Sequence, residues 1–399
     1  MTLLSENRRV QADPLWKYSA LCEQDARPER LNLIVGVYRN DEGVCPTLRA
    51  VTVAERRLLE HPVSKAYVGP SGNQRFVALL AELVVPNADV RARMRGIQAV
   101  AGTGALRLLS ELLAQDMPDR TVLLGTPAYI NHRPILTAAG LQIEEYPLLD
   151  AAGHRDVQLD IEAIAQARPG DVVLIQGCCH NPTGTELIPE QWDRLGQALR
   201  DHGVIPFFDQ AYFGLGNGLD RDLAGMRHVL ELVPEAVVSV SASKAWGLYS
   251  ERAGGAFIVS PDAGVRDDAM TMLETISRAA YSQPSAHGAL IVETVLGDPG
   301  LRADWRVELD SMRDRLNASR RALVARLEHA HALPADRLAA LQAQRGMFLA
   351  LPCTPEQMAQ LRDRHAIHGL PGGRINLAGV PSTRIDDLAA GLTDVLAAG

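Results

Sequence analysis

The chain has 399 residues, of which 47% are hydrophobic and 22% charged, and its formal net charge at pH 7 is −8. This length is enough for two domains or one large two-lobed unit, and the composition is typical of a soluble globular enzyme. Positive and negative side chains are interspersed and form no basic stripe, which argues against nucleic acid as the main partner.

Several features of the chain bear on its compartment. The N-terminal stretch MTLLSENRRVQADP has neither an apolar core nor a small-residue cleavage site, so we expect no signal peptide. No stretch reaches the roughly 18 apolar residues of a membrane span, so we expect no membrane association. Five cysteines without disulfide-framework spacing favour reduced thiols in the cytoplasm. Cys178 and Cys179 are adjacent and lack further ligands at metal-binding spacing, so we expect no metal site.

Apolar runs alternate with amphipathic stretches through the middle of the chain. The helical stretches include Ala105–Gln115, whose leucines share one face, and Pro189–His202, with Pro in its first turn and Gly203 just past its end. This alternation predicts an α/β fold with a mostly parallel sheet covered on both faces. The predicted strands are Gln98–Ala101, Thr121–Leu124, Asp171–Gln176, Val204–Phe208, Ala236–Ser241 and Gly255–Val259.

The C-terminal part of the chain has a different pattern. From about Leu301 to His331 the sequence is rich in Arg, Leu, Ala and Glu without internal Pro or Gly, which predicts a long helix linking two lobes. The elements predicted after it are strands at Met347–Leu351 and Arg374–Leu377, and helices at Pro355–His365 and Arg384–Ala398.

Polar clusters fall where predicted strands end, the edge at which open α/β sheets bind ligands. The first cluster is Ala101-Gly-Thr-Gly-Ala-Leu106, which opens a helix at Ala105. Its glycines allow close approach of an anion, and the helix N-terminus offers free N–H groups. A plain tight turn explains this motif equally well on its own.

Two further clusters follow the next strands. In Cys178-Cys-His-Asn-Pro-Thr-Gly184, Asn181 precedes a proline, which disfavours the helical region and allows its amide to point out of the sheet edge. The alternative is a simple β-turn. Asp209 follows an apolar strand, where a buried carboxylate needs a cationic or donating partner, and Tyr212 lies three residues further on.

The stretch SASKAWGLYSER carries the strongest signal. Ser241, Ser243 and Arg252 supply hydroxyls and a guanidinium that suit a phosphate group. Lys244 lies among them, where nearby cations and burial lower the pKa of an amine and leave it able to attack a carbonyl. A glycine-flanked Arg374 near the C-terminus could bind a carboxylate as a fork.

Each cluster alone is more often structural than functional. Together they meet the demands of one cofactor, pyridoxal 5′-phosphate (PLP): a phosphate cradle, a carboxylate for the ring nitrogen, donors for the phenolic oxygen and a lysine for the aldehyde.

With these motifs, and with ADPLWKYSAL, NLIVGVYRNDEG and GGRINLAGV, the chain resembles the class I (subgroup Iα) aminotransferases of the aspartate/aromatic type. The resemblance runs nearly end to end. It implies a fold-type I PLP-dependent enzyme, in which a large domain with a mostly parallel seven-stranded sheet sandwiched by helices is joined to a smaller α+β domain. The implied boundaries are an N-terminal arm at 1–12, a small domain of 13–45 and 306–399, and a large PLP-binding domain of 46–305.

The resemblance also implies roles for the cofactor residues. Lys244 would bond to the cofactor aldehyde and move the substrate proton, and Asp209, supported by His132, would pair with the ring nitrogen. Asn181 and Tyr212 would bond the phenolic oxygen. The other implied cofactor-binding residues are Gly102, Thr103, Tyr129, Ser241, Ser243 and Arg252.

The substrate residues follow in the same way. Arg374 would bind the substrate α-carboxylate, beside Gly36 and Phe348, with Tyr129 and Asn181 also in reach. In this family the residue matching Tyr67 reaches the phosphate of the neighbouring subunit, and the one matching Arg278 reaches the neighbour's substrate side chain. The implied assembly is a homodimer with shared active sites.

The sequence departs from the family pattern around the substrate pocket. Tyr129 stands where the family usually has Trp, and Gln176 where His is common. Gln283-Pro-Ser285 replaces Asn-Pro-Pro, and Pro70 and Ser71 follow the Tyr67 segment. The resemblance therefore implies an acidic or aromatic substrate without choosing between them.

The predicted activity is transfer of an amino group from an L-amino acid to a 2-oxo acid such as 2-oxoglutarate by a ping-pong route. One alternative is elimination, replacement or other Cα-carbanion chemistry on the same scaffold, which the altered pocket keeps open. A non-catalytic relative would be expected to have lost Lys244 or Asp209. A Rossmann nucleotide-binding protein would need a third glycine that AGTGALR lacks.

Overall fold

The computed structural model describes residues 14–150 and 153–397, which form two compact units. The larger unit comprises Cys45–Ala318 and Ala343–Phe348, and the smaller unit comprises the described parts of Met1–Val44, Ser319–Gln342 and Leu349–Gly399. The N-terminal arm predicted at 1–12 lies outside the described residues. The predicted domain boundaries stay a prediction.

A seven-stranded sheet forms the centre of the larger unit, in the order β2-β8-β7-β6-β5-β3-β4. β8 is antiparallel to both of its neighbours, and all other neighbouring strands are parallel. Every residue of β7 and β8 is buried, as expected for strands covered on both faces. The predicted α/β class with a mostly parallel seven-stranded sheet is confirmed. The strands are β2 (Met94–Val100), β3 (Thr121–Thr126), β4 (Gln142–Pro147), β5 (Val172–Gln176), β6 (Ile205–Gln210), β7 (Ala236–Ser241) and β8 (Ala253–Val259).

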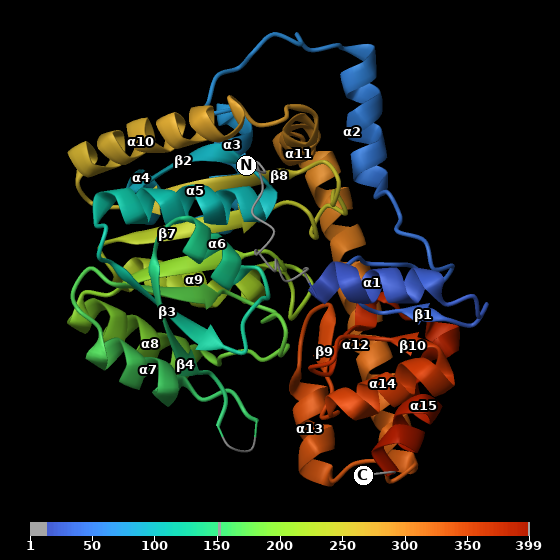
Figure 1. Cartoon of the computed structure of the whole chain (residues 1–399). Helices are drawn as coiled ribbons and strands as arrows, with labels where there is room; N and C mark the ends of the chain where they lie inside the picture. Colours follow the sequence, from blue (N-terminus) through green and yellow to red (C-terminus); the bar gives the residue numbers. More distant parts are fainter. Residues whose placement is uncertain (1–13, 151–152, 398–399) are drawn as a thin grey trace, which may run out of the picture. The chain divides into compact units, whose positions relative to one another are not determined.

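Helices cover both faces of this sheet (Figure 1). On one face, Leu109 of α5 and Leu273 of α10 pack with Val122 and Phe207 of the sheet in one apolar core. On the other face, α7, α8 and α9 pack against one another. The helices of this unit are α2 (Arg49–Glu60), α3 (Gln74–Val84), α4 (Ala88–Ala92), α5 (Ala101–Asp116), α6 (His132–Ala138), α7 (Val157–Gln166), α8 (Pro189–His202), α9 (Leu219–Leu232), α10 (Ala263–Tyr281) and α11 (His287–Gly297).

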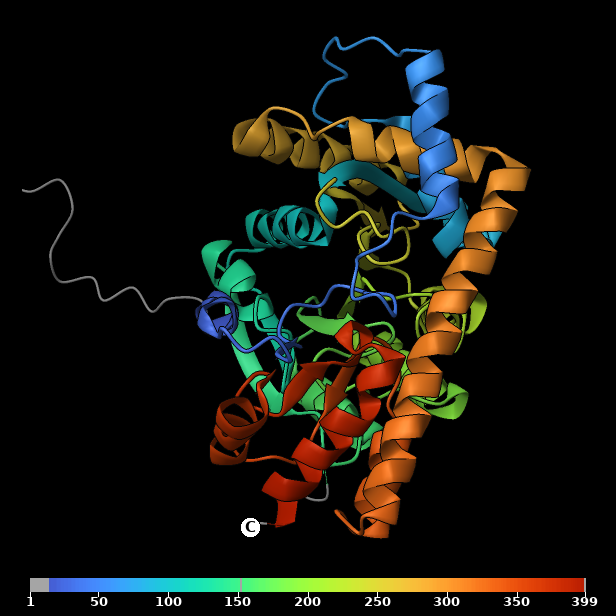
Figure 2. The same ribbon diagram turned by 90° about the vertical axis from the view of Figure 1, so that its right-hand side faces the viewer.

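The long helix predicted from about Leu301 to His331 is α12 (Pro299–His329), a continuous helix of 31 residues (Figure 2). Its first part belongs to the larger unit, and its last part, from Ser319 on, belongs to the smaller unit.

The smaller unit has its own apolar core, in which Leu327 of α12 packs with Leu361, Ile375 and Leu392. Two short sheets pair β1 with β10 in parallel and β9 with β11. The elements around this core are α1 (Pro14–Gln24), β1 (Leu31–Asn32), α13 (Ala335–Ala343), β9 (Phe348–Ala350), α14 (Pro355–His365), β10 (Ile367–His368), β11 (Arg374–Asn376) and α15 (Ile385–Ala397).

The largest errors in the predicted elements are two misplaced starts and one missed strand of the large sheet. β2 begins at Met94, four residues before the predicted start. α5 begins at Ala101 rather than at Ala105, so the AGTGA motif is the first turn of the helix itself. β4 was not predicted at all. Among the helices of the described residues, none combines the length and the apolar character needed to cross a membrane.

Candidate active site

The predicted cofactor residues gather at the carboxyl ends of three neighbouring parallel strands in the larger unit. Asn181 follows β5, Asp209 lies near the end of β6, and Ser241 ends β7. Parallel strands end at the same edge of a sheet, so residues far apart in the chain meet there. Lys244 and Tyr212 lie on the loops that leave this edge.

Lys244 lies against Tyr212, with its Nζ atom 5.0 Å from the centre of the tyrosine ring. Burial lowers the pKa of Lys244 to about 8; Asp209 opposes this shift and Arg252 adds to it. An amine with this pKa is uncharged in about a tenth of molecules at pH 7, far more than an ordinary lysine, and nucleophilic attack on a carbonyl requires the uncharged form.

The backbone beside Lys244 is firmly held. The indole Nε1 of Trp305 donates a 2.7 Å hydrogen bond to the carbonyl of Ala245. Trp246 stacks on the same indole, with ring centres 4.6 Å apart and planes 3° from parallel. The lysine therefore extends from a rigid loop, which limits the positions that its amine can reach.

Asp209 is buried and paired with a buried histidine. Its Oδ2 lies 3.0 Å from Nε2 of His132, the first residue of α6. The ring of Tyr129 meets that of His132 edge to face, with centres 5.2 Å apart. The prediction that His132 supports the Asp209 carboxylate agrees with this contact, and it places Tyr129 beside the same pair.

Gln176 holds Asn181 by two hydrogen bonds. Its side chain donates to the carbonyl of Asn181 at 2.9 Å and accepts from the N–H of Asn181 at 2.8 Å. The side-chain amide of Asn181 in turn donates to the hydroxyl of Tyr212 at 3.4 Å. Gln176 also pairs with Asp209 across the β5–β6 ladder. Sequence comparison marked Gln176 as a departure but gave no sign of this contact.

A cradle for an anion forms at the N-terminus of α5. The N–H of Ala101 donates to the carbonyl of Arg252 at 3.1 Å, but no side chain caps the helix, so the N–H groups that follow in its first turn remain available to a ligand. Gly102 allows the close approach, because a Cβ atom there would lie 3.0 Å from the Cβ of Ser241. Thr103 is exposed in the same turn.

Hydroxyl and guanidinium groups complete the cradle. The Oγ atom of Ser241 accepts from the N–H of Ser243 at 3.2 Å, and Arg252 donates to the Oγ atom of Ser243 at 3.4 Å. Ala101 and Arg252 have φ angles of 54° and 55°, in the left-handed region that non-glycine residues rarely adopt. Such strain clusters at functional sites. This donor set fits a phosphate dianion, and with Lys244 and Asp209 the residues fit PLP.

Gly36 and Arg374 lie in the smaller unit and are brought together there. The guanidinium of buried Arg374 donates to the carbonyl of Ile34. The side chain of Asn376 donates to the carbonyls of Val35 and Val37 at 2.9 and 2.8 Å, on either side of Gly36. Asn376 was not a predicted site residue, although it lies two residues after Arg374.

The remaining predicted residues belong to the larger unit. The ring of Phe348 meets that of Tyr212 edge to face, with centres 5.7 Å apart. Tyr67 is 89% exposed, and Arg278 is exposed near the end of α10. These two side chains therefore project from the surface of this unit, as residues donated to another subunit would.

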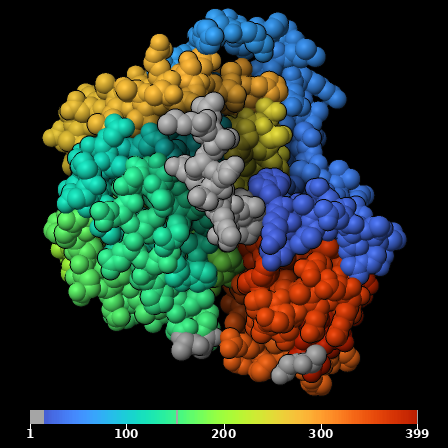
Figure 3. All heavy atoms as spheres, in the orientation of Figure 1, coloured from blue at the N-terminus to red at the C-terminus, as the bar shows by residue number. Residues whose placement is uncertain are grey.

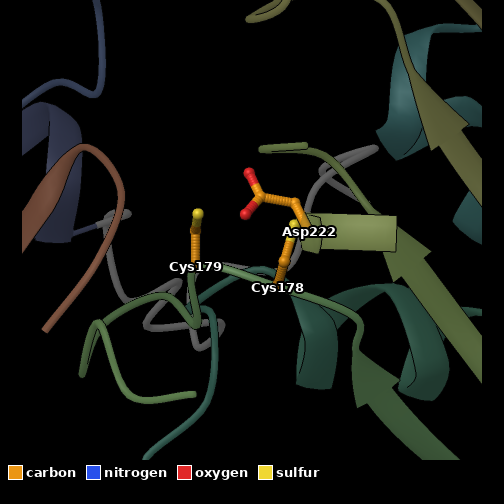
Figure 4. Close-up of side chains that lie close together, drawn as sticks. All are labelled: Cys178, Cys179 and Asp222. Carbon is orange, nitrogen blue, oxygen red and sulfur yellow. The ribbon is translucent and has the colours of Figure 1, made fainter. Parts of the chain in front are cut away.

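The structure also brings together three groups that the sequence spacing did not connect. The thiols of Cys178 and Cys179 and the carboxylate of Asp222, from α9, have potential ligand atoms within 4.8 Å of one another (Figure 4). Asp222 already accepts hydrogen bonds from the N–H groups of Gly214, Gly216 and Asn217 at 2.8, 2.9 and 2.6 Å. It therefore closes the loop before α9. The pKa of the Cys179 thiol is raised well above its ordinary value, first by its hydrogen bond with Cys178 and then by burial.

Comparison with known proteins agrees with this geometry. The family model of aminotransferase class I and II matches residues 28–392, a range that contains every predicted site residue. The chain belongs to this family. It is an aminotransferase.

Relatives of this aminotransferase are similar over nearly their whole length. It is 42% identical to a tyrosine aminotransferase of Rhizobium meliloti, covering 97% of this chain and 98% of the relative. It is 37% identical to an aspartate aminotransferase of Salmonella typhi, covering 96% and 98%. An aromatic-amino-acid aminotransferase from Burkholderia pseudomallei, solved covalently bound to pyridoxal phosphate, superposes with a TM-score of 0.95 at 33% identity, covering 99% of this chain and all of that one.

Proposed function

We propose that this aminotransferase moves the amino group of an acidic or aromatic L-amino acid to a 2-oxo acid such as 2-oxoglutarate by a ping-pong mechanism. The observation that carries the proposal is the placement of Lys244, whose amine has a lowered pKa and lies against Tyr212. The names of the relatives, which include tyrosine, aromatic-amino-acid and aspartate aminotransferases, support this range of substrates.

The cofactor of this enzyme is PLP, which supplies, when bound, an electron sink for the electron pair left at the substrate Cα. Lys244 would hold the cofactor through its aldehyde, and its amine would take the proton from the substrate Cα and return a proton at the end of the half-reaction. The rigid loop around Trp305 keeps this amine in position.

The other residues of the larger unit bind and orient the cofactor. Asp209, fixed by His132, would hold a proton on the ring nitrogen. Asn181 and Tyr212 would donate to the phenolic oxygen, and Tyr129 would contact the ring. The phosphate would be held by Gly102, Thr103, Ser241, Ser243 and Arg252.

Substrate binding would involve residues of this chain and of a second copy. Arg374, with Gly36 beside it, binds the substrate α-carboxylate as a fork. Phe348 and Asn181 line the remaining pocket. The exposure of Tyr67 and Arg278 supports a homodimer in which each subunit lends these residues to its partner. We propose a reducing compartment such as the cytoplasm, since none of the five cysteines, all within the described residues, forms a disulfide.

A single-turnover experiment tests the reaction type. Holoenzyme mixed with an amino acid, without any oxo acid, should release one equivalent of oxo acid per subunit and then stop, because the amino group has no acceptor. Adding 2-oxoglutarate should restart the reaction. Continuous release of product without an acceptor would instead indicate elimination chemistry. Comparing Tyr, Phe, Asp and Glu with aliphatic amino acids in the same assay defines the substrate range.

A further inference from the structure

Gln283, a departure from the family sequence pattern, contacts the segment that carries two further departures, Pro70 and Ser71. The side-chain Oε1 of Gln283 accepts hydrogen bonds from the N–H groups of Val68 and Gly69, at 2.8 and 3.3 Å. These two residues follow Tyr67 directly, and Gln283 follows Arg278 by five positions. One side chain therefore connects the segments that carry the two residues proposed to serve the partner subunit.

Hydrogen bonds also hold the backbone of the 68–72 segment at Pro70 and Ser71. The hydroxyl of Ser277 donates to the carbonyl of Pro70 at 2.9 Å, and the N–H of Gln98 donates to the carbonyl of Ser71 at 3.0 Å. Gly72 has a φ of 70°, and a Cβ atom there would lie 2.5 Å from the Cβ of Gln98 and 2.8 Å from Pro284. Gly72 is thus closely packed against Gln98 and Pro284, whereas the residues before it are partly exposed and are held by the hydrogen bonds described.

Tyr67 and Arg278 each lie next to a residue that is held by a hydrogen bond. Tyr67 immediately precedes Val68, whose N–H is bound, and Arg278 immediately follows Ser277, whose hydroxyl is bound. Figure 3 shows the gold α10 region and the light blue region before α3 side by side at the surface of the larger unit. Fixing the backbone one residue away limits the directions in which an exposed side chain leaves the surface. It also lowers the conformational entropy that the segment would lose on docking.

We propose that Gln283 is a positioning residue that sets Tyr67 and Arg278 in register for a second copy of this chain. The inference rests on the proposed function, in which Tyr67 binds the cofactor phosphate and Arg278 the distal carboxylate of an acidic substrate in the partner's site. Gln283 touches neither ligand. It acts by keeping the two donated side chains at a fixed spacing.

The competing explanation is that Gln283 only stabilises a surface loop. The two roles differ in what a substitution changes. A stabilising contact lowers the thermal midpoint and affects all substrates equally, whereas a positioning contact weakens PLP retention through Tyr67 and discriminates against acidic substrates through Arg278.

Gln283→Met keeps the length of the side chain but removes the acceptor, and Gln283→Glu keeps an acceptor. Gln197→Met is the matched control, because Gln197 is exposed on α8 and bonds only to Asp193 on its own helix among the described residues. For each holoenzyme we would measure the PLP dissociation constant, kcat/KM for an acidic and an aromatic amino acid, dimer dissociation by sedimentation and the thermal midpoint.

We expect Gln283→Met to weaken PLP binding about three- to tenfold, as loss of one or two neutral hydrogen bonds does, and to lower kcat/KM more for the acidic than for the aromatic substrate. Gln283→Glu, which keeps an acceptor, should bind PLP about as tightly as the wild type. In a Tyr67→Phe background, Gln283→Met should weaken PLP binding little further, because its effect passes through Tyr67.

The outcomes distinguish an error in the proposed role of Tyr67 from an error in the positioning role of Gln283. If Tyr67→Phe leaves PLP binding unchanged, the assigned role of Tyr67 is wrong and the inference falls with it. If Tyr67→Phe weakens PLP binding and Gln283→Met does not, or if the two effects add fully, the positioning role is overturned while the proposed function stands. Should Gln283→Met fail to fold, Ser277→Ala, which removes the bond to Pro70, is measured in its place against the same expectations.

Discussion

The side chain of Gln176 bonds both backbone polar groups of Asn181, at 2.9 Å to the carbonyl and 2.8 Å from the N–H. Since the Asn181 side chain reaches the Tyr212 hydroxyl, the amide at the end of β5 controls the two groups proposed to bond the phenolic oxygen of the cofactor. A substitution at Gln176 should therefore change the cofactor's titration as well as the rate.

Gln176→Leu leaves the Asn181 backbone groups without these partners, and we expect kcat to fall about tenfold, for a loss of about 1–2 kcal/mol. Hydrogen bonds to a phenolic oxygen favour its deprotonated form, so weakening them should raise the midpoint of the visible absorbance titration by about one pH unit. A pH titration of the holoenzyme measures this shift. Gln197→Leu, on the exposed face of α8, is the control, and an unchanged midpoint in Gln176→Leu would contradict the proposed role.

Lys244→Ala should abolish the visible absorbance of the holoenzyme and reduce turnover by at least about 10⁴-fold, because the variant lacks both the covalent attachment point and the base. Absorption spectra and steady-state rates check both effects. Lys244→Arg is a second variant that keeps the charge but cannot attack a carbonyl at neutral pH. Multiple turnovers near the wild-type rate in either variant would refute the assignment.

The pKa of about 8 at Lys244 predicts how its amine reacts with pH. Since a lysine becomes nucleophilic on losing its proton, acetylation of Lys244 in the apoenzyme should rise as the pH increases through about 8. The chain has only two other lysines, Lys17 and Lys65, both exposed, so mass spectrometry can follow all three sites in one sample.

The neighbours of Lys244 give this experiment its controls. Asp209 raises the pKa of Lys244 and Arg252 lowers it. Asp209→Asn should therefore shift the acetylation curve to lower pH, and Arg252→Gln should shift it to higher pH. Shifts in the opposite directions would show that the charges around the amine act differently from the arrangement described.

Arg278→Ala should lower kcat/KM for aspartate and glutamate by about 10- to 100-fold, the size expected for loss of a charge-assisted bond to a carboxylate. The losses for tyrosine and phenylalanine should be far smaller, because their side chains carry no distal anion. Steady-state kinetics on the four substrates measure the difference. Equal losses for acidic and aromatic substrates would mean that Arg278 does not bind a distal carboxylate.

The sequence predicted the bounds of an element correctly where residues typical of helix starts and ends lie at both of its ends. The bounds of α8 were predicted correctly because Pro189 lies at its first position and Gly203, with a φ of 65°, ends it. β4 was missed because its sequence, QIEEYP, is polar and mostly exposed and lacks the apolar run of its neighbours. The start of α5 was placed too late because its glycine-rich first turn resembles a loop.

The site residues were predicted from their types and their positions after strands, but their partners were not. The contact of Gln283 with Val68 spans 215 positions of sequence, and no periodicity or motif reports a bond of that kind. Asp222 was not connected with Cys178 and Cys179 for the same reason, since the fold alone brings α9 to the end of β5. The sequence shows which residue types are present, whereas the contacts between distant residues are known only from the fold.

The left-handed backbone at Ala101 and Arg252 carries a cost that is present whether or not an anion is bound, on the order of 1–3 kcal/mol for each residue. Glycine at position 101 would relieve the strain there but would raise the entropy of the unfolded chain, so the two effects oppose each other. Because the coenzyme binds only the folded chain, loading should raise the thermal midpoint by mass action without removing this strain.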